Sequence, residues 1–341
     1  MSIACEVLGL PGQDNALLVR VNSGQRITRL LFDCGESTLA TLGFGEIQAI
    51  DHLFFSHLHM DHIGGFDTFF RAAYGREDRP NRIWGPPETA RILQHRFQGF
   101  LWNLHQEMPA TSWLVHDVYP DQIRTTRFEL GEAFALAHPV GAQPVEGTCI
   151  LSTTDFTVSA LAMDHKTTTL AYVVRESPRR NVSPTRLAEL GLRPGSWLQQ
   201  VKEATPEQLA GGTEVEVDGR RFPLAQLQRE LVVAQPGDSV AYLTDLLLDD
   251  AAIERLTPAL TGCQTVVCEC QYRNADLALA ETNYHMIPAQ VALLAQRAGV
   301  ERLILFHLST RYSPLIWPEM LAEVRRGFAR AEFPDHWQAT L

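Results

Sequence analysis

The feature that most constrains this chain is a cluster of metal-ligand side chains directly after an apolar stretch. The apolar stretch ends at Phe55, and residues 57–62 then read His-Leu-His-Met-Asp-His. His57 and His59 are two positions apart, so both imidazole rings point to the same side of an extended chain. Three His and one Asp within six residues are more than one tetrahedral site with an open position accepts, so they suit two adjacent metals.

The ligand types narrow the choice of metal. Imidazole and carboxylate groups are the mix expected for Zn, Mn or Fe, and the motif contains no thiolate. Residues 66–73 follow a Gly-Gly pair and carry apolar side chains at helical spacing. The alternative interpretation, in which the motif is a loop of solvated polar residues, gives no reason for this spacing directly after an apolar strand.

The spacing His-x-His-x-Asp-His resembles the motif of the metallo-β-lactamase superfamily. The resemblance implies an α/β fold, namely an αββα sandwich of two mixed β-sheets flanked by helices, with a binuclear metal site at one edge. It also implies that Asp33, in a predicted strand over residues 29–35, is a structural carboxylate near the site. A plain turn carboxylate is the alternative for Asp33.

Further candidate ligands stand at the ends of other apolar strands. Residues 239–245 form a predicted strand that ends in Asp245, and with two metals nearby we interpret this carboxylate as bridging rather than as a turn or helix cap. His307 follows the last apolar strand. His165 and His138 are rival candidates for one more ligand. The resemblance favours His165, because in the superfamily an Asp-His pair before an apolar strand with Tyr carries a ligand.

The length of 341 residues suggests about two domains, but a sandwich of this type can use most of that length in one. We therefore expect a single metallo-β-lactamase-like domain over residues 1–341, with an inserted arm at residues 176–232. The insertion begins at a polar, Pro-marked break over residues 177–184. It is slightly basic, but its sequence alone favours a solvated excursion. Its basic residues include Arg179, Arg180, Arg186, Arg193 and Lys202.

Turn residues and apolar periodicity predict several other elements. We expect a β-hairpin around Pro11-Gly12, a short helix over residues 37–42, and a helix over residues 288–298. A longer helix is predicted over residues 88–107, which contain His95 and His105.

Charge and cysteine content limit the function classes. A net charge of −11 argues against a broadly basic surface for nucleic acid, although a local basic patch or bound metal can still meet phosphate. The six cysteines contain no CxxC pair, and Cys268 and Cys270 are interpreted as buried thiols of a core strand. We therefore expect a reduced, cytoplasmic chain. No signal peptide and no apolar stretch of ~18 residues is evident, so we expect no membrane partner.

Several segments together resemble the ribonuclease Z family of tRNA 3′-processing endonucleases. The most family-specific segment is residues 303–312, Leu-Ile-Leu-Phe-His-Leu-Ser-Thr-Arg-Tyr. The other resembling segments are residues 31–36, 56–62, 164–165, 191–195 and 244–245, and His285 followed by Ala289-Gln290. The chain departs from the family in the loop over residues 8–15, at Met60, and in its arm. These departures concern tRNA specificity and leave the hydrolytic centre unchanged.

The resemblance implies a role for each site residue. The implied ligands of two divalent ions, Zn first with Mn or Fe as alternatives, are His57, His59 and His165 for one, Asp61, His62 and His307 for the other, and Asp245 for both. Asp61 would also orient the attacking water, and His285 would face the leaving group. Ser309 and Arg311 would lie near the substrate phosphate. A homodimer and a substrate-binding arm are implied as well.

The implied function is a binuclear metal-dependent phosphodiester hydrolase, an endonuclease that removes 3′ trailers from tRNA precursors. A phosphodiesterase for small diesters or cyclic nucleotides is the alternative that the altered N-terminal loop and the acidic charge favour. A hydrolase of sulfate esters or lactones is a third candidate, but Ser309 and Arg311 have no purpose on a neutral lactone. The complete ligand set argues against a non-catalytic binding module. The expected partner is therefore RNA or a small phosphodiester.

Overall fold

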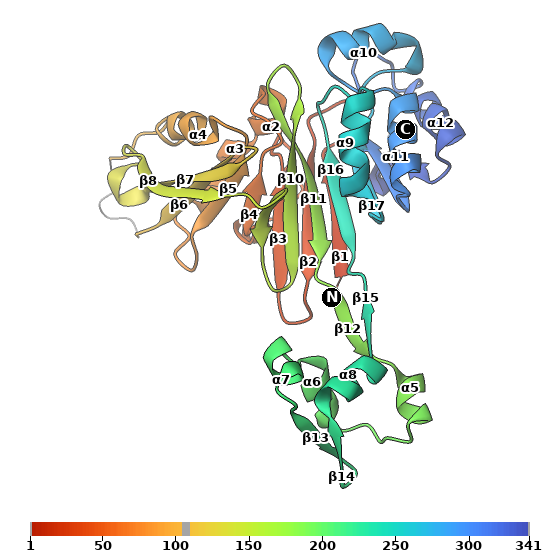
Figure 1. The fold of residues 1–341 in the computed structure, drawn as a ribbon. Helices are drawn as coiled ribbons and strands as arrows, with labels where there is room; N and C mark the ends of the chain where they lie inside the picture. The colour runs from red at the N-terminus through yellow and green to blue at the C-terminus, as the bar shows by residue number, and fades with distance from the viewer. Residues whose placement is uncertain (1, 104–109, 340–341) are drawn as a thin grey trace. The chain divides into compact units, whose positions relative to one another are not determined.

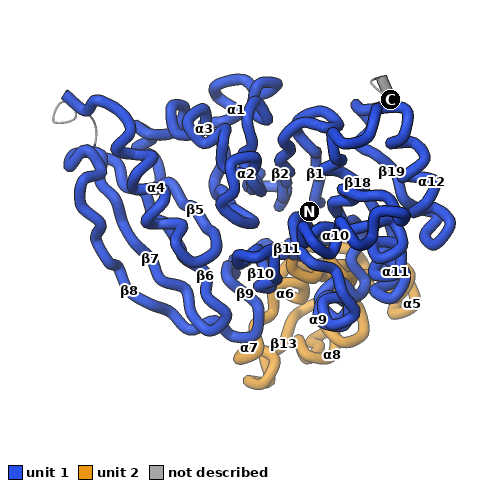
Figure 2. The backbone as a smooth tube through the Cα atoms, turned by 90° about the horizontal axis from the view of Figure 1, so that it is seen from above, with its two compact units in different colours: residues 1–175, 238–341 blue, residues 176–237 orange. Residues whose placement is uncertain are grey.

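The chain divides into two compact units. In the computed structural model, which describes residues 2–103 and 110–339, one unit comprises residues 1–175 and 238–341 and the other residues 176–237 (Figure 2). Among the described residues, no helix has the length and apolar character needed to cross a membrane.

The first sheet of the larger unit has eight strands in sequence order. β1 and β2 form the hairpin predicted around Pro11-Gly12, and β3, β4, β5 and β6 run parallel to one another (Figure 1). The strands are β1 (Ser2–Leu8), β2 (Ala16–Asn22), β3 (Ile27–Phe32), β4 (His52–Phe54), β5 (Asn81–Gly85), β6 (Ser112–Val118), β7 (Gln122–Glu129) and β8 (His138–Pro144).

The second sheet has seven strands in the order β19-β18-β17-β16-β11-β10-β9. β16, β17, β18 and β19 are parallel, whereas β11 pairs with β16 in the antiparallel sense. The strands are β9 (Cys149–Ser152), β10 (Phe156–Asp164), β11 (Thr168–Glu176), β16 (Ser239–Leu243), β17 (Thr265–Glu269), β18 (Arg302–Phe306) and β19 (Ala331–Glu332).

Aromatic rings fill the space between the two sheets. Phe32 stacks on Phe54 in the first sheet, and both rings contact Tyr172 of the second, while Tyr242 also contacts Phe32. All four side chains are buried in one apolar core. Burial of such large rings is a major source of folding energy.

Helices cover the sheets on both sides of the sandwich (Figure 1), so the predicted αββα arrangement of two mixed sheets is confirmed. α3 and α4 share a second apolar core with the outer face of the first sheet. The helices of this unit are α1 (Phe44–Gln48), α2 (Met60–Ile63), α3 (Phe66–Ala73), α4 (Thr89–Phe97), α9 (Asp250–Leu260), α10 (Leu277–Asn283), α11 (Pro288–Ala298) and α12 (Trp317–Gly327).

Two predicted helices differ from the observed ones. Residues 37–42 form turns, because Ser37 adopts a left-handed φ of 61°, and the helix α1 begins only at Phe44. The helix predicted over residues 88–107 ends at Phe97, and His105 lies outside the described residues. By contrast, α3 and α11 have the predicted bounds.

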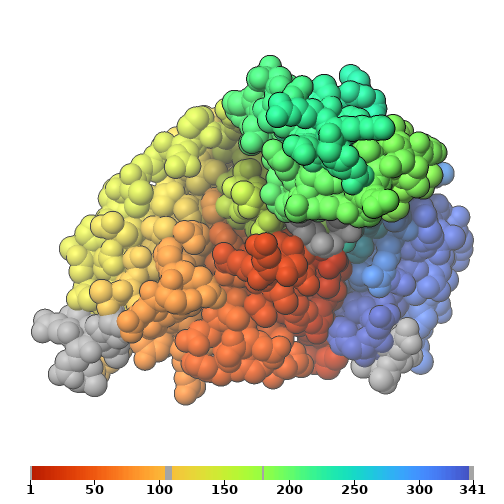
Figure 3. Space-filling model, turned by 90° about the horizontal axis from the view of Figure 1, so that it is seen from below, coloured from red at the N-terminus to blue at the C-terminus, as the bar shows by residue number. Residues whose placement is uncertain are grey.

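The smaller unit has an apolar core of its own. Leu187, Val201, Leu224 and Leu227 are buried together in it, and the space-filling view shows the green residues of this unit as one continuous mass (Figure 3). The sequence favoured a solvated excursion for this segment, and that prediction is wrong because the segment buries an apolar core. Its elements are β12 (Arg179–Val182), α5 (Pro184–Glu189), α6 (Trp197–Lys202), α7 (Pro206–Ala210), β13 (Glu214–Val217), β14 (Arg220–Pro223), α8 (Leu224–Leu231) and β15 (Val232–Gln235).

Candidate metal centre

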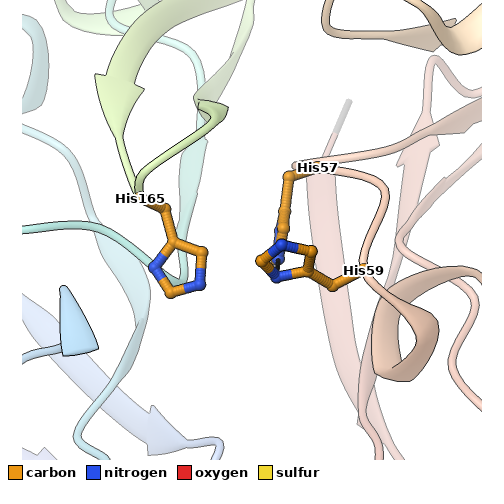
Figure 4. Close-up of side chains that lie close together, drawn as sticks. All are labelled: His57, His59 and His165. Atoms are coloured by element: carbon orange, nitrogen blue, oxygen red, sulfur yellow. Dashed lines mark hydrogen bonds between the residues drawn. The ribbon is translucent and has the colours of Figure 1, made fainter.

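Three histidines converge at the edge of the sandwich. His57 and His59 lie between β4 and α2, and His165 lies in the turn after β10 (Figure 4). The rings of His57 and His59 face that of His165, with one ring nitrogen of each residue within 4.8 Å of the others. His57 Nε2 and His59 Nδ1 are 2.9 Å apart. His165 Nδ1 donates to the Tyr284 carbonyl at 2.8 Å, which leaves Nε2 free for the centre.

A second group contains Asp61, His62, Asp245 and His307, whose ligand atoms also lie within 4.8 Å of one another. Asp61 Oδ2 is 3.4 Å from His62 Nε2 and 3.5 Å from His307 Nε2. Asp61 is at the start of α2, whereas His307 directly follows β18. The structure therefore brings together residues that are about 250 positions apart in the chain.

Asp245 faces both groups with different oxygens. Its Oδ1 is 3.5 Å from His62 Nε2, on the side of the second group. Its Oδ2 is 3.8 Å from His57 Nε2 and 3.5 Å from His165 Nε2, on the side of the first. A carboxylate with one oxygen toward each group has the arrangement of a bridging ligand.

Asp33 binds the ring nitrogen of His62 that is opposite the ligand group. His62 Nδ1 donates to Asp33 Oδ2 at 2.7 Å, and the Ser56 amide and hydroxyl donate to the same carboxylate, each at 2.7 Å. His62 Nε2 is then left buried and without a hydrogen-bond partner among the described residues. A histidine bound through one nitrogen by a carboxylate, with the other directed into a ligand cluster, fits a metal ligand.

The backbone at the strand ends is unusual. Asp33, Asp245 and His307 each follow a strand with left-handed φ values of 58°, 48° and 53°. This conformation is uncommon for residues other than glycine and is concentrated at functional sites. Close packing beside it requires glycine, since a Cβ on Gly65 would be 2.2 Å from the Gly35 carbonyl oxygen.

A carboxylate that the sequence analysis missed completes the site. Glu269 ends β17 and is fully buried, with Oε2 3.0 Å from His285 Nδ1 and 3.2 Å from His307 Nδ1. A charged residue inside an otherwise apolar strand was the signal that could have found it, because an unpaired buried carboxylate is costly. Its neighbours Cys268 and Cys270 are buried thiols, as predicted, and burial raises their pKa.

The local electrostatics separate the histidines by role. Burial lowers the pKa of His57 to about 2, so its ring is neutral and can donate a lone pair. Burial opposes protonation of His285, but the charge of Glu269 and its hydrogen bond raise the pKa of His285 overall. Burial likewise acts to raise the pKa of Asp61, but the nearby imidazoles of His307 and His62 outweigh it and lower this pKa, which favours the ionised carboxylate.

Asp245, Glu269, His285 and His307 form a third group of possible ligands. The remaining predicted residues, Ser309 and Arg311, lie outside all three groups. Ser309 is half-buried and Arg311 exposed, and the Arg311 amide donates to the Ser309 hydroxyl at 3.2 Å. His138, the rival of His165, instead contacts Glu132 at 2.6 Å. A cavity of about 680 Å³ opens beside Asp61, lined also by Asp14, Glu36, Met60, Ile63, Gly64 and Arg96.

The sequence of this chain is similar to those of known proteins. The family described as the Beta-lactamase superfamily domain matches residues 28–183. A ribonuclease Z from Deinococcus radiodurans is 48% identical over 335 residues, which cover 98% of both chains.

Solved structures share the fold at low sequence identity. The metallo-β-lactamase fold protein YhfI from Bacillus subtilis superposes with a TM-score of 0.55 at 18% identity, covering 97% of this chain and 95% of that one. The short form of human tRNase Z has a TM-score of 0.50 at 15% identity, covering 92% and 94%. The near-complete match at 48% identity shows that the chain belongs to the ribonuclease Z family of metal-dependent hydrolases, within the β-lactamase superfamily.

Proposed function

We propose that this chain is a two-metal phosphodiesterase that removes 3′ trailers from tRNA precursors. The observation that carries the proposal is the position of Asp245, with one oxygen toward each ligand group. The 48% identity to a ribonuclease Z supports the RNA substrate.

The proposed ligands follow the two groups. His57, His59 and His165 would hold one divalent ion, the remaining three ligands would hold the other, and Asp245 would be shared. Zinc suits the imidazole and carboxylate donors, with Mn or Fe as alternatives. When bound, such a metal pair lowers the pKa of water and neutralises the charge on a phosphoryl group.

Two side chains would move protons. Asp61 is ionised, and its side chain is 43% exposed toward solvent, so it can orient the attacking water and accept its proton. His285 contacts Glu269, which raises the pKa of His285 and favours the protonated ring. It would give that proton to the departing 3′ oxygen, as a general acid does.

Arg311 and Ser309 would hold the phosphate. Arg311 is exposed just after the ligand His307, and a guanidinium forms short, charge-assisted hydrogen bonds with phosphoryl oxygens. The Ser309 hydroxyl can donate a further hydrogen bond.

The charge distribution favours RNA contact by the smaller unit. Residues 176–237 contain eight acidic and eight basic side chains, so the remainder of the chain carries the whole net charge of −11. A neutral unit with exposed Arg180, Arg186 and Arg193 repels a polyanion less than the rest of the chain does. We therefore assign this unit the role of the substrate-binding arm.

A phosphodiesterase for small diesters is the second candidate. The cavity of about 680 Å³ beside Asp61 is large enough for such a substrate. However, its lining by Asp14, Glu36 and Asp61 places three carboxylates near an anionic substrate, which favours diesters whose non-phosphate part fills the cavity.

We also propose a homodimeric assembly and a cytoplasmic location. A homodimer is proposed from resemblance to the family, and analytical ultracentrifugation tests it. A reducing cytoplasm suits the six cysteines, all of which are free thiols.

The deciding experiment compares two substrates on one zinc-loaded sample. Cleavage of a tRNA precursor next to the discriminator nucleotide, measured by gel analysis of an end-labelled RNA, supports the proposal. Turnover of bis(p-nitrophenyl) phosphate without RNA cleavage would support the second candidate and overturn the first.

A further inference from the structure

We propose that Tyr242 is a positioning residue of the metal centre, acting through Asp33 on His62. Tyr242 lies on β16 of the seven-stranded sheet, while Asp33 follows β3 of the eight-stranded sheet. The Tyr242 hydroxyl donates to Asp33 Oδ2 at 2.9 Å. The same oxygen accepts from His62 Nδ1 at 2.7 Å, so the phenol and the imidazole share one acceptor.

The donors to Asp33 come from two different parts of the fold. Ser56 and His62 belong to the segment around the histidine motif. Among the described residues, Tyr242 is the donor to Asp33 that comes from the opposite sheet. Both Asp33 and Tyr242 are fully buried, and a hydrogen bond to a buried carboxylate is stronger than one between neutral groups.

This hydrogen bond joins the two halves of the centre. Asp245 lies three residues after Tyr242, just beyond the end of the same strand, and its Oδ1 is 3.5 Å from His62 Nε2. Tyr242 therefore connects the strand that carries Asp245 to the carboxylate that orients His62. Without the phenol, Asp33 has one restraint fewer, and His62 loses part of the constraint that directs Nε2 at the ligand group.

Tyr172 offers a matched control. It is also fully buried on the seven-stranded sheet, contacts Phe32 as Tyr242 does, and donates across the core. Its acceptor, however, is the main-chain carbonyl of Phe55 at 2.7 Å and not the Asp33 carboxylate. Removing either hydroxyl deletes one buried hydrogen bond between the sheets, but only the Tyr242 hydroxyl donates to the carboxylate oxygen to which His62 also donates.

The test compares Tyr242→Phe with Tyr172→Phe in the full chain. Zinc affinity is measured by competition with a chromophoric chelator, and the melting temperature of the metal-free protein is measured in parallel. We expect Tyr242→Phe to weaken zinc binding by about 10-fold, the lower end of the range for residues behind metal ligands, in one of two binding phases. Tyr172→Phe should leave the zinc affinity of both phases within about 2-fold of that of the unaltered chain. It should lower the melting temperature of the metal-free protein by about as much as Tyr242→Phe does.

The outcomes separate this inference from the metal centre on which it rests. If the two variants bind zinc with equal affinity, the positioning role of Tyr242 is overturned, and its hydrogen bond to Asp33 is a structural one. Failure of the unaltered chain to bind zinc would instead overturn the proposed metal centre itself. The readout is metal binding, so it does not depend on which phosphodiester is the substrate.

Discussion

The two halves of the metal centre are built in different ways. The half on the eight-stranded sheet provides its candidate ligands from six consecutive residues, 57–62. The half on the seven-stranded sheet provides His165, Asp245 and His307, together with the supporting Glu269, from the ends of four separate strands. The first half is local in sequence, whereas the second exists only once the strands are aligned.

In the second half, the alignment of parallel strands brings together residues that are distant in sequence. β16, β17 and β18 are parallel neighbours, with Leu243 opposite Cys268 and Glu269 opposite Phe306. The residues at or just after these positions therefore meet at one edge of the sheet, where the carboxyl ends of parallel strands place ligand-binding groups. A sequence motif therefore reveals one half of such a site, and the residues of the other half stand at the ends of strands.

Replacing Asp245 should have the largest effect, because this residue faces both halves. Asp245→Ala removes the shared carboxylate that faces His57, His62 and His165. We expect loss of bound metal and of all hydrolysis, measured by elemental analysis and by both substrate assays. Glu254→Ala, at an exposed position on α9, is the control; retention of full metal content in Asp245→Ala would contradict the bridging role.

Replacing His285 should separate catalysis from metal binding. His285→Ala removes the proposed proton donor but none of the seven proposed ligands, so turnover should fall by about 10²–10⁴-fold with metal content unchanged. His138→Ala, outside the ligand groups, is the control and should keep full turnover. If His285→Ala loses metal as well, His285 belongs to the ligand set and its assigned role is wrong.

Replacing Glu269 should move the pH profile rather than abolish activity. Glu269 raises the pKa of His285 above its ordinary value, and a general acid works only while it holds its proton. Activity therefore falls as the pH rises through the pKa of His285. Glu269→Gln lowers that pKa, so the decline in kcat/KM should begin at a lower pH.

The measurement for Glu269→Gln is a profile of kcat/KM against pH, with metal content determined at each pH because Glu269 also contacts His307. An unchanged high-pH limb at full metal loading would show that Glu269 does not set the protonation of His285.

A change in the smaller unit should have the smallest effect on chemistry. Leu227→Ala in the core of that unit should cost about 2–5 kcal/mol of its stability. We expect weaker cleavage of tRNA precursors and unchanged turnover of bis(p-nitrophenyl) phosphate, measured side by side. Exposed Gln199→Ala on α6 is the control, and equal losses on both substrates would show that the unit also supports the metal centre.

Local patterns were sufficient for several elements. The β1–β2 hairpin, α3 and α11 follow from turn residues and apolar periodicity. The helix predicted over residues 88–107 was too long, since it ends at Phe97. Apolar periodicity does not predict the residue at which a helix ends, because tertiary packing can override local preference.

The sequence by itself determined that this chain carries a dense imidazole and carboxylate cluster after an apolar strand, because those residues are adjacent in the chain. Only the tertiary structure decided that Glu269 supports His285 and that Tyr242 reaches Asp33 across the core. It also decided that residues 176–237 have a core of their own. The physical reason is common to all three: each depends on burial and strand register between residues distant in sequence, and no local pattern encodes such contacts.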